Sequence, residues 1–456
     1  MLYDTLSLGF LLGCILFICP RLSVSRPSYP PSSDFSDSTN NNGQADLPGK
    51  FVPFSQLSEC PILPPRKAPK NAKDVRPDDF KVVAALGDSI TAALLARGSR
   101  DDSHLHFLSR TRVQPQSQSK IYLRAEQKPF SEEMPMQKQR PAQIPEIAEW
   151  RGLSYATGSD ENAITIPNIL KHYSPNLTGT STGRHPPISC LGMGWDIGCG
   201  LHPAEDGLNA AISGSLAVGL LSQVRDYLIP KMIELGVQDE DWKYVNIGIG
   251  ANDVCAYCLT PNSTIFPMSG TPKQFARNIQ KAVNELRLHV PNIIVNIVGL
   301  LRVSDIYELT LKDPYCRTPG LPLPHLALEC SCALLPGPAG DYTRQRMDEQ
   351  GKAYDEAVLE VIREWEEEDD PSFGAIWQPG TAVDLKNYPI EALSKIDCFH
   401  PSEMSHQRVA VGLWNRLTLS YEDKFRPIPW EEEPLIRCLE EDDRIRIGEI
   451  TKHLRD

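Results

Sequence analysis

The chain has 456 residues, a length that suits one large α/β domain with embellishments or two to three average domains. Hydrophobic residues make up 41% and charged residues 23%, which is ordinary globular usage and excludes a wholly disordered chain. With 46 basic and 59 acidic side chains, the formal charge is -13. This excess of negative charge repels phosphate backbones, so we predict no nucleic-acid partner.

The first element in chain order is an apolar run over residues 6–19, followed by small and polar residues at 23–25. The run is too short to span a hydrocarbon core, which takes about 20 residues. It predicts a signal peptide over residues 1–25 that is removed, and therefore a secreted, extracellular protein. A membrane anchor is the alternative, because the segment before the run holds Asp4 and no basic residue.

Composition predicts a folded domain over residues 78–425, with a polar segment on either side and one polar insertion within it. Residues 26–77 are rich in Pro and Ser and predict a flexible leader. Residues 99–146 hold many Gln, Ser and Arg and predict a polar surface insertion. Residues 426–456 are predicted to form an acidic tail at the C-terminus.

Strands and helices are predicted to alternate through the rest of the chain. Thr271 and Pro272 mark a helix start, because Thr caps a helix well and Pro suits its first position. This alternation predicts an α/β fold, a three-layer α/β/α sandwich with a parallel central sheet. The expected strands are 81–86, 244–249, 292–299 and 373–378, and the expected helices are 90–96, 208–229, 271–289, 341–367 and 403–419.

Cysteines and glycosylation sequons support the secretory route. Ten cysteines follow the predicted signal, and an even number there predicts disulfides, although the spacing leaves their pairing open. The sequons at Asn176 and Asn262 predict N-glycosylation. A zinc site at 255–258 and 330–332 is the alternative, which we disfavour because the predicted compartment is oxidising, and we predict no metal.

Candidate catalytic side chains follow the predicted strands. Ser89 comes directly after the first strand, at the end where ligand sites of open α/β sheets lie. Asp397 and His400 share a loop before the last helix, where the carboxylate can orient an imidazole that accepts the serine proton. Helix capping by Ser89 and a packed His-Pro loop are the structural alternatives.

Two further residues are candidate donors to an oxyanion. Asn252 ends the second strand, and its amide can donate a hydrogen bond to a developing negative charge. Gly158 can present a backbone N–H to the same oxygen. Each of them also suits an ordinary turn.

Taken together, these motifs resemble the blocks of the GDSL (SGNH) hydrolase family. They are Gly-Asp-Ser at 87–89, Gly-x-Asn-Asp at 250–253 and Asp-x-x-His at 397–400. The flanking sequences are similar to the phospholipase B branch, and the resemblance runs from about residue 60 to 420. One departure is Gly158-Ser159-Asp160, where the branch usually has Gly-Gly-Asp.

The resemblance implies a serine ester hydrolase that forms an acyl-enzyme and uses no cofactor. Ser89 would be the nucleophile, His400 the base and Asp397 its orienting acid. The oxyanion would lie among the amide of Ser89, the amide of Gly158 and the side chain of Asn252.

The implied substrates are phospholipids and lysophospholipids, with transient contact at a membrane surface. Two alternatives stay open: a small-molecule or carbohydrate esterase, and a catalytically silent lipid-binding glycoprotein.

Overall fold

The computed structural model describes residues 47–97, 147–187, 201–258, 270–311, 313–316 and 329–450. All of these ranges belong to one compact unit, residues 42–456. The predicted signal at 1–25, the first part of the leader, the insertion at 99–146 and the sequon at Asn262 lie outside the described residues.

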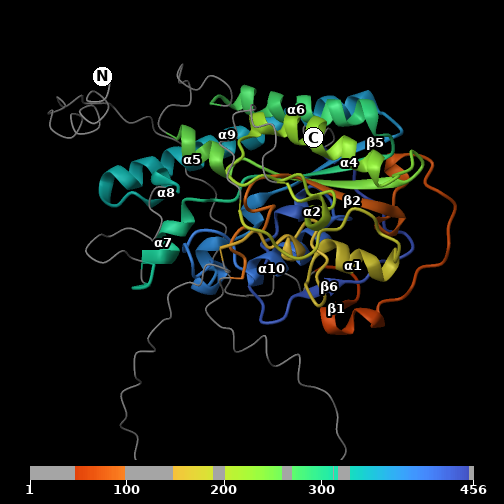
Figure 1. The fold of residues 1–456 in the computed structure, drawn as a ribbon, viewed down its shortest axis with the longest axis horizontal. Helices are drawn as coiled ribbons and strands as arrows, with labels where there is room; N and C mark the ends of the chain where they lie inside the picture. Colours follow the sequence, from red (N-terminus) through yellow and green to blue (C-terminus); the bar gives the residue numbers. More distant parts are fainter. Residues whose placement is uncertain are drawn as a thin grey trace, which may run out of the picture. The chain divides into compact units, whose positions relative to one another are not determined.

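A parallel four-stranded sheet forms the centre of the domain (Figure 1). Its strands run in the order β2 (Phe80–Gly87), β3 (Trp242–Gly248), β4 (Ile293–Val298) and β5 (Phe373–Gln378). The strands are buried almost throughout, which suits apolar runs covered on both faces. The register places the last residues of the four strands opposite one another, so their carboxyl ends meet at one edge.

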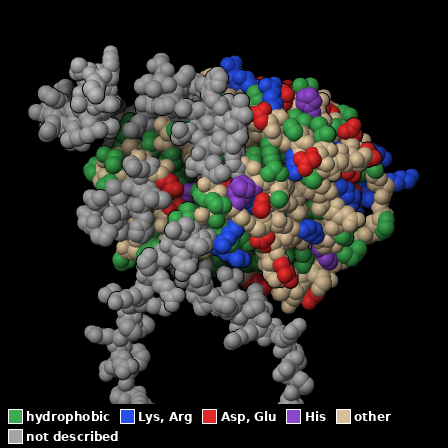
Figure 2. Space-filling view, in the orientation of Figure 1, with side chains coloured by type: hydrophobic (Ala, Val, Ile, Leu, Met, Phe, Trp, Pro, Cys, Tyr) green, Lys and Arg blue, Asp and Glu red, His purple; other side chains and the backbone are tan. Residues whose placement is uncertain are grey.

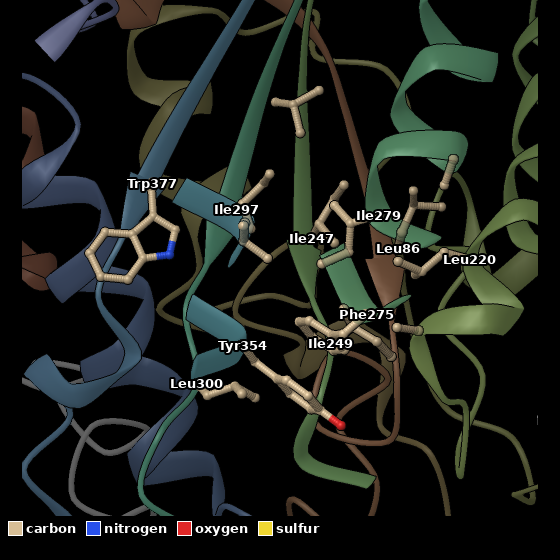
Figure 3. Close-up of a cluster of buried hydrophobic side chains, with 14 of the residues drawn as sticks. Leu86, Leu220, Ile247, Ile249, Phe275, Ile279, Ile297, Leu300, Tyr354 and Trp377 are labelled. Carbon is tan, nitrogen blue, oxygen red and sulfur yellow. The ribbon is translucent and has the colours of Figure 1, made fainter. Parts of the chain in front are cut away.

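One face of the sheet is covered by α3 (Leu220–Ser222), α4 (Ile229–Glu234), α6 (Pro272–His289) and α9 (Gly337–Glu368). Figure 3 shows the core between these layers, where Leu86, Ile247 and Ile297 of the sheet pack with Ile279 of α6 and Tyr354 of α9. The predicted start of α6 is confirmed, because the Thr271 hydroxyl accepts a hydrogen bond from the Gln274 amide.

The opposite face is covered by α1 (Ile166–Tyr173) and α10 (Glu403–Arg416). Beside them lies a second, antiparallel sheet made of β1 (Phe51–Pro53) and β6 (Leu435–Arg437). The predicted three-layer α/β/α class is therefore confirmed.

Shorter elements complete the described part of the chain. The remaining α-helices are α2 (Pro203–Asp206), α5 (Ala251–Tyr257), α7 (Asp305–Leu311) and α8 (Ser331–Leu334). A π-helical turn covers Gln223–Leu228. Short 3-10 helices cover Phe54–Glu59, Ala72–Asp74, Pro77–Asp79, Arg151–Leu153, Ala217–Gly219, Gly380–Ala382, Leu385–Asn387, Ile390–Ala392 and Glu422–Phe425.

The chain on either side of the expected domain differs from the prediction. From residue 47 onward, the predicted leader is ordered by pairing between β1 and β6, and Val75 is fully buried. The Cys60–Cys438 disulfide joins the leader to the predicted tail, which the structure describes as far as residue 450. Local composition did not reveal this order, because each segment is held by a partner far away in the sequence.

Two predicted helices also differ from the structure. Residues 90–96 form turns, because Ala93 and Leu95 adopt positive φ angles of 57° and 59° that interrupt helical hydrogen bonding. The expected helix over 208–229 begins only at 217–220, since the chain around Asn209 and Ala210 first runs along the free edge of β2.

Eight of the ten cysteines form four disulfides, which confirms the predicted oxidation of these residues and excludes the zinc alternative at 255–258 and 330–332. Cys190 and Cys199 lie outside the described residues. The pairs are Cys60–Cys438, Cys255–Cys330, Cys258–Cys332 and Cys316–Cys398.

The surface in Figure 2 carries acidic, basic and apolar side chains interspersed over one face. Within the described ranges, no helix has the length and apolar character needed to cross a bilayer.

Candidate active site

Ser89 lies at the carboxyl end of β2, where the chain turns sharply away from the sheet. The turn is fixed by the buried carboxylate of Asp88, which accepts a hydrogen bond from the Ile90 amide at 3.0 Å. Gly87 makes the close approach possible, because a Cβ there would lie 2.4 Å from the Gly248 carbonyl oxygen of β3. The serine is therefore held at the meeting point of two strand ends.

Asp397 and His400 lie in the loop that leads into α10. One carboxylate oxygen of Asp397 accepts hydrogen bonds from the amides of Phe399 and His400 at 2.9 and 3.1 Å. Between them, Cys398 adopts a φ of 53° and is bonded to Cys316, which ties the loop to a distant segment. These contacts fix the acid and the imidazole relative to each other.

The structure brings the three predicted side chains into one hydrogen-bonded chain. His400 Nδ1 lies 2.5 Å from Asp397 Oδ2, and His400 Nε2 lies 2.8 Å from Ser89 Oγ. An Nδ1–H that donates to Asp397 leaves Nε2 as the acceptor for the Ser89 hydroxyl. The imidazole is thus oriented to take the serine proton, which is the geometry required of a general base.

The charges around His400 favour its protonated form. Burial by itself lowers the pKa of His400, but the charge and hydrogen bond of Asp397, followed by the charges of Glu329 and Asp88, raise that pKa to about 9. Burial raises the pKa of Asp88 to about 6. These charges therefore stabilise the imidazolium form of His400.

Asn252 lies in the first turn of α5, and its side chain lines the same cavity as Ser89 and His400. Gly250 precedes the helix with a φ of 122°, and a Cβ there would lie 2.5 Å from Leu300. One hydrogen of the Asn252 amide is donated to the Ser215 carbonyl at 3.0 Å. A side-chain amide carries two hydrogens, so the second can serve a ligand in the cavity.

Gly158 is not brought into this arrangement. Its amide donates to the Ser154 carbonyl at 2.8 Å, and it is absent from the described residues that line the cavity. Ser159, which stands where the branch usually has Gly, makes a contact of its own: its hydroxyl accepts a hydrogen bond from Lys171. The predicted oxyanion role of Gly158 thus gains no support from its hydrogen bonding here.

A cavity opens beside Ser89 and His400, and the empty space there, counted together with open solvent at its mouth, is about 1090 Å³. Its walls are mostly apolar and come from the segments after β4 and β5, the start of α7 and the loop before α10. The sequence analysis did not identify this cavity, although the apolar residues Leu300, Leu301 and Val303 shortly after the third predicted strand are a signal for it. The apolar lining includes Ile249, Val298, Leu300, Leu301, Val303, Ile306, Val383, Leu385, Leu393 and Phe399.

Two groups beside the triad, one buried and one partly buried, were also missed from the sequence. The Tyr155 amide donates to His406 Nδ1 at 3.3 Å, and burial, aided by the nearby charge of His400, lowers the pKa of His406 to about 3. Glu329 Oε1 lies 3.3 Å from His400 Nδ1. Neither residue belongs to a motif, so only their positions in the fold identify them.

Among the described residues, Glu329, Asp397 and His400 form a group whose ligand atoms lie within 4.8 Å of one another. Both imidazole nitrogens of His400 already make hydrogen bonds, one to the carboxylate and one to the serine. We therefore interpret the group as a hydrogen-bonded charge cluster rather than as a metal centre.

A parallel α/β/α fold with serine, imidazole and carboxylate aligned at its strand ends is typical of serine hydrolases. Residues 83–413 match the family model described as GDSL-like Lipase/Acylhydrolase. The chain belongs to this family, as the resemblance of its motifs implied.

Two relatives that share one name are similar to the chain at modest identity. The chain is 27% identical to "Phospholipase B1, membrane-associated" of Mus musculus over 382 residues, which is 81% of this chain and 20% of the relative. The protein of that name from Homo sapiens is 27% identical over 396 residues, covering 83% of this chain and 22% of the relative. The chain thus spans about a fifth of the length of these proteins.

Proposed function

We propose that this protein is a secreted serine ester hydrolase that cleaves fatty-acyl esters of phospholipids and lysophospholipids. The observation that carries the proposal is the hydrogen-bonded chain Ser89–His400–Asp397 opening onto a mostly apolar cavity. Such a cavity suits an acyl chain, because burying a methylene is worth about 0.8 kcal/mol. The similarity to proteins named phospholipase B1 supports the same substrate class.

The reaction uses the groups already in place. Ser89 Oγ attacks the ester carbonyl while His400 Nε2 takes its proton, and the imidazolium then protonates the departing alcohol. The negative oxygen is stabilised by the Ser89 amide and the second hydrogen of Asn252. Water, activated by the same imidazole, then cleaves the acyl-enzyme and releases the fatty acid.

Secretion is supported by the four disulfides, which form in oxidising compartments. Asn176 is exposed, so this sequon is accessible to glycosylation.

The test combines a serine-reactive fluorophosphonate with a mixed phospholipid and lysophospholipid substrate. Labelling at Ser89 together with release of free fatty acid is the expected result. Labelling without lipid hydrolysis would reject the lipid assignment and favour the small-ester esterase. A folded protein that is not labelled would favour the silent lipid-binding glycoprotein.

Replacing Asn252 with Ala should lower kcat by roughly 10²-fold, because one oxyanion donor is lost. The measurement is steady-state hydrolysis of a short chromogenic ester. Asn387→Ala is the matched control: it removes an exposed asparagine that bonds to Asp384 and does not line the cavity. An unchanged kcat in Asn252→Ala would assign the oxyanion contact to another group.

Filling the cavity with Val383→Trp should separate lipid from small-ester recognition. Val383 lines the cavity, so the indole would occupy space needed by a long acyl chain. We expect kcat/KM for a long-chain ester to fall about tenfold, while an acetyl ester is cleaved as before. Equal losses on both esters would show that the acyl chain binds elsewhere.

A further inference from the structure

Glu329 places a second carboxylate beside the nitrogen of His400 that contacts Asp397. Its Oε1 lies 3.3 Å from His400 Nδ1, and the same nitrogen lies 2.5 Å from Asp397 Oδ2. Glu329 comes from a different part of the chain, directly before α8. Its neighbour Cys330 is bonded to Cys255 of α5, so a disulfide anchors this segment to the helix that carries Asn252.

The environment of Glu329 does not suit a purely structural carboxylate. Its side chain is 21% exposed, and its Oε2 atom is buried with no hydrogen-bond partner in the part of the chain that the structure describes. Leaving a carboxylate oxygen buried and unpaired is costly unless an opposite charge lies nearby. Within the described ranges, the ion-pair partner of Glu329 is His400.

The groups that face His400 come from four elements. Among the described residues, none of these groups carries a positive charge. Asp397 faces it from its own loop, Glu329 from the segment before α8, and Asp88 from the end of β2. His406 of α10 stays neutral, because burial lowers its pKa to about 3. Burial raises the pKa of Glu329 to about 7, which the charge of His400 opposes and that of Asp397 reinforces.

We propose that Glu329 is a positioning residue, a second carboxylate that stabilises the protonated form of His400 during acyl transfer and sets the pH at which this base becomes available. The inference rests on the proposed roles of Ser89 and His400. In the step itself, the proton leaves Ser89 Oγ for His400 Nε2 and passes to the departing alcohol. Glu329 exchanges no proton with the substrate and acts through the charge of the imidazolium.

The proposal predicts a shift in the pH profile. The base must be neutral to accept the serine proton, so activity rises as pH passes upward through the pKa of His400. Since a nearby negative charge raises that pKa, Glu329→Gln should move the acid limb of kcat/KM to lower pH, by about 1 pH unit. The plateau at high pH should fall several-fold, because the imidazolium is less stabilised.

The experiment measures kcat/KM against pH for the full secreted chain with p-nitrophenyl butyrate. Glu329→Asp keeps the charge and should leave the acid limb close to the wild-type position. Glu391→Gln is the matched control, because Glu391 lies in the 3-10 helix before the catalytic loop and is not among the groups that shift His400. This variant removes one negative charge that does not contact His400, so its kcat/KM should depend on pH as in the wild type.

An acid limb that stays in place in folded Glu329→Gln would overturn the proposal, as would an equal shift in Glu391→Gln. If Glu329→Gln does not fold, a titration of the wild-type protein tests the proposal. The Nδ1–H proton resonance of His400 should then titrate in two steps, since Glu329 and His400 influence each other, and a single step would contradict the proposal. The short ester allows the role of Glu329 and the lipid substrate to be tested separately. If the acid limb of kcat/KM shifts but the protein does not hydrolyse lipid, the role of Glu329 stands and the lipid assignment is rejected.

Discussion

Replacing Ser89 with Ala should lower ester turnover by at least roughly 10³-fold, because among the described residues Ser89 supplies the hydroxyl that is hydrogen-bonded to the imidazole of His400. Ser89 Oγ is the atom within 2.8 Å of His400 Nε2, and the loss of one hydroxyl leaves the surrounding strand ends unchanged. The melting temperature should therefore stay within a few degrees of wild type, since ΔΔG near 1 kcal/mol shifts it by only about 2–4 °C. Hydrolysis of a chromogenic ester and thermal unfolding provide the two measurements.

Ser405→Ala is the matched control for this variant. Ser405 is also buried and also lines the cavity, but its hydroxyl donates to the Ala392 carbonyl at 2.6 Å and does not contact His400. Its activity should stay within a few-fold of wild type. Normal turnover by Ser89→Ala would show that this serine only shapes the turn after β2, and the proposed acyl-enzyme mechanism would have to be abandoned.

The parts of the fold that are encoded locally could be predicted from the sequence. The four strands of the central sheet are mostly apolar runs, and the helix α6 begins at a recognisable cap. The triad candidates could be chosen because each follows a strand or precedes a helix in a short motif. The structure brings Ser89 and His400 together across 311 residues, a proximity that follows from the parallel order of the strands.

The rest depends on contacts between distant segments, which single-sequence patterns do not report. The composition of residues 26–77 predicted a flexible leader. The order of its later part comes instead from the pairing of β1 with β6 and from the Cys60–Cys438 disulfide, which are both contacts with distant segments. Glu329 belongs to no motif and lies in a segment that the Cys255–Cys330 disulfide joins to α5. The amide of Gly158 is occupied by a backbone carbonyl, which its motif could not indicate.

Replacing Asp397 with Asn should produce the second large loss, roughly 10³- to 10⁴-fold in kcat, with little change in the fold. The two carboxylate oxygens of Asp397 accept different hydrogen bonds. One accepts the amides of Phe399 and His400, and an asparagine oxygen can keep both of these bonds. The other accepts Nδ1–H of His400, and there the asparagine would present an NH₂ group instead. The imidazole would then carry its proton on Nε2, facing Ser89, and could not accept the serine proton.

The measurement is kcat for a short ester across pH, with Asp355→Asn as the matched control. Asp355 is another buried carboxyl, and it accepts the Leu300 amide at 3.1 Å without contacting the triad. Burial raises the pKa of Asp355 to about 7, so the neutral asparagine resembles a form that the wild-type side chain already adopts. We expect this control to retain activity. A loss below about tenfold in Asp397→Asn would mean that another group selects the tautomer of His400, and Glu329, 3.3 Å from the same nitrogen, is the carboxylate placed to do so.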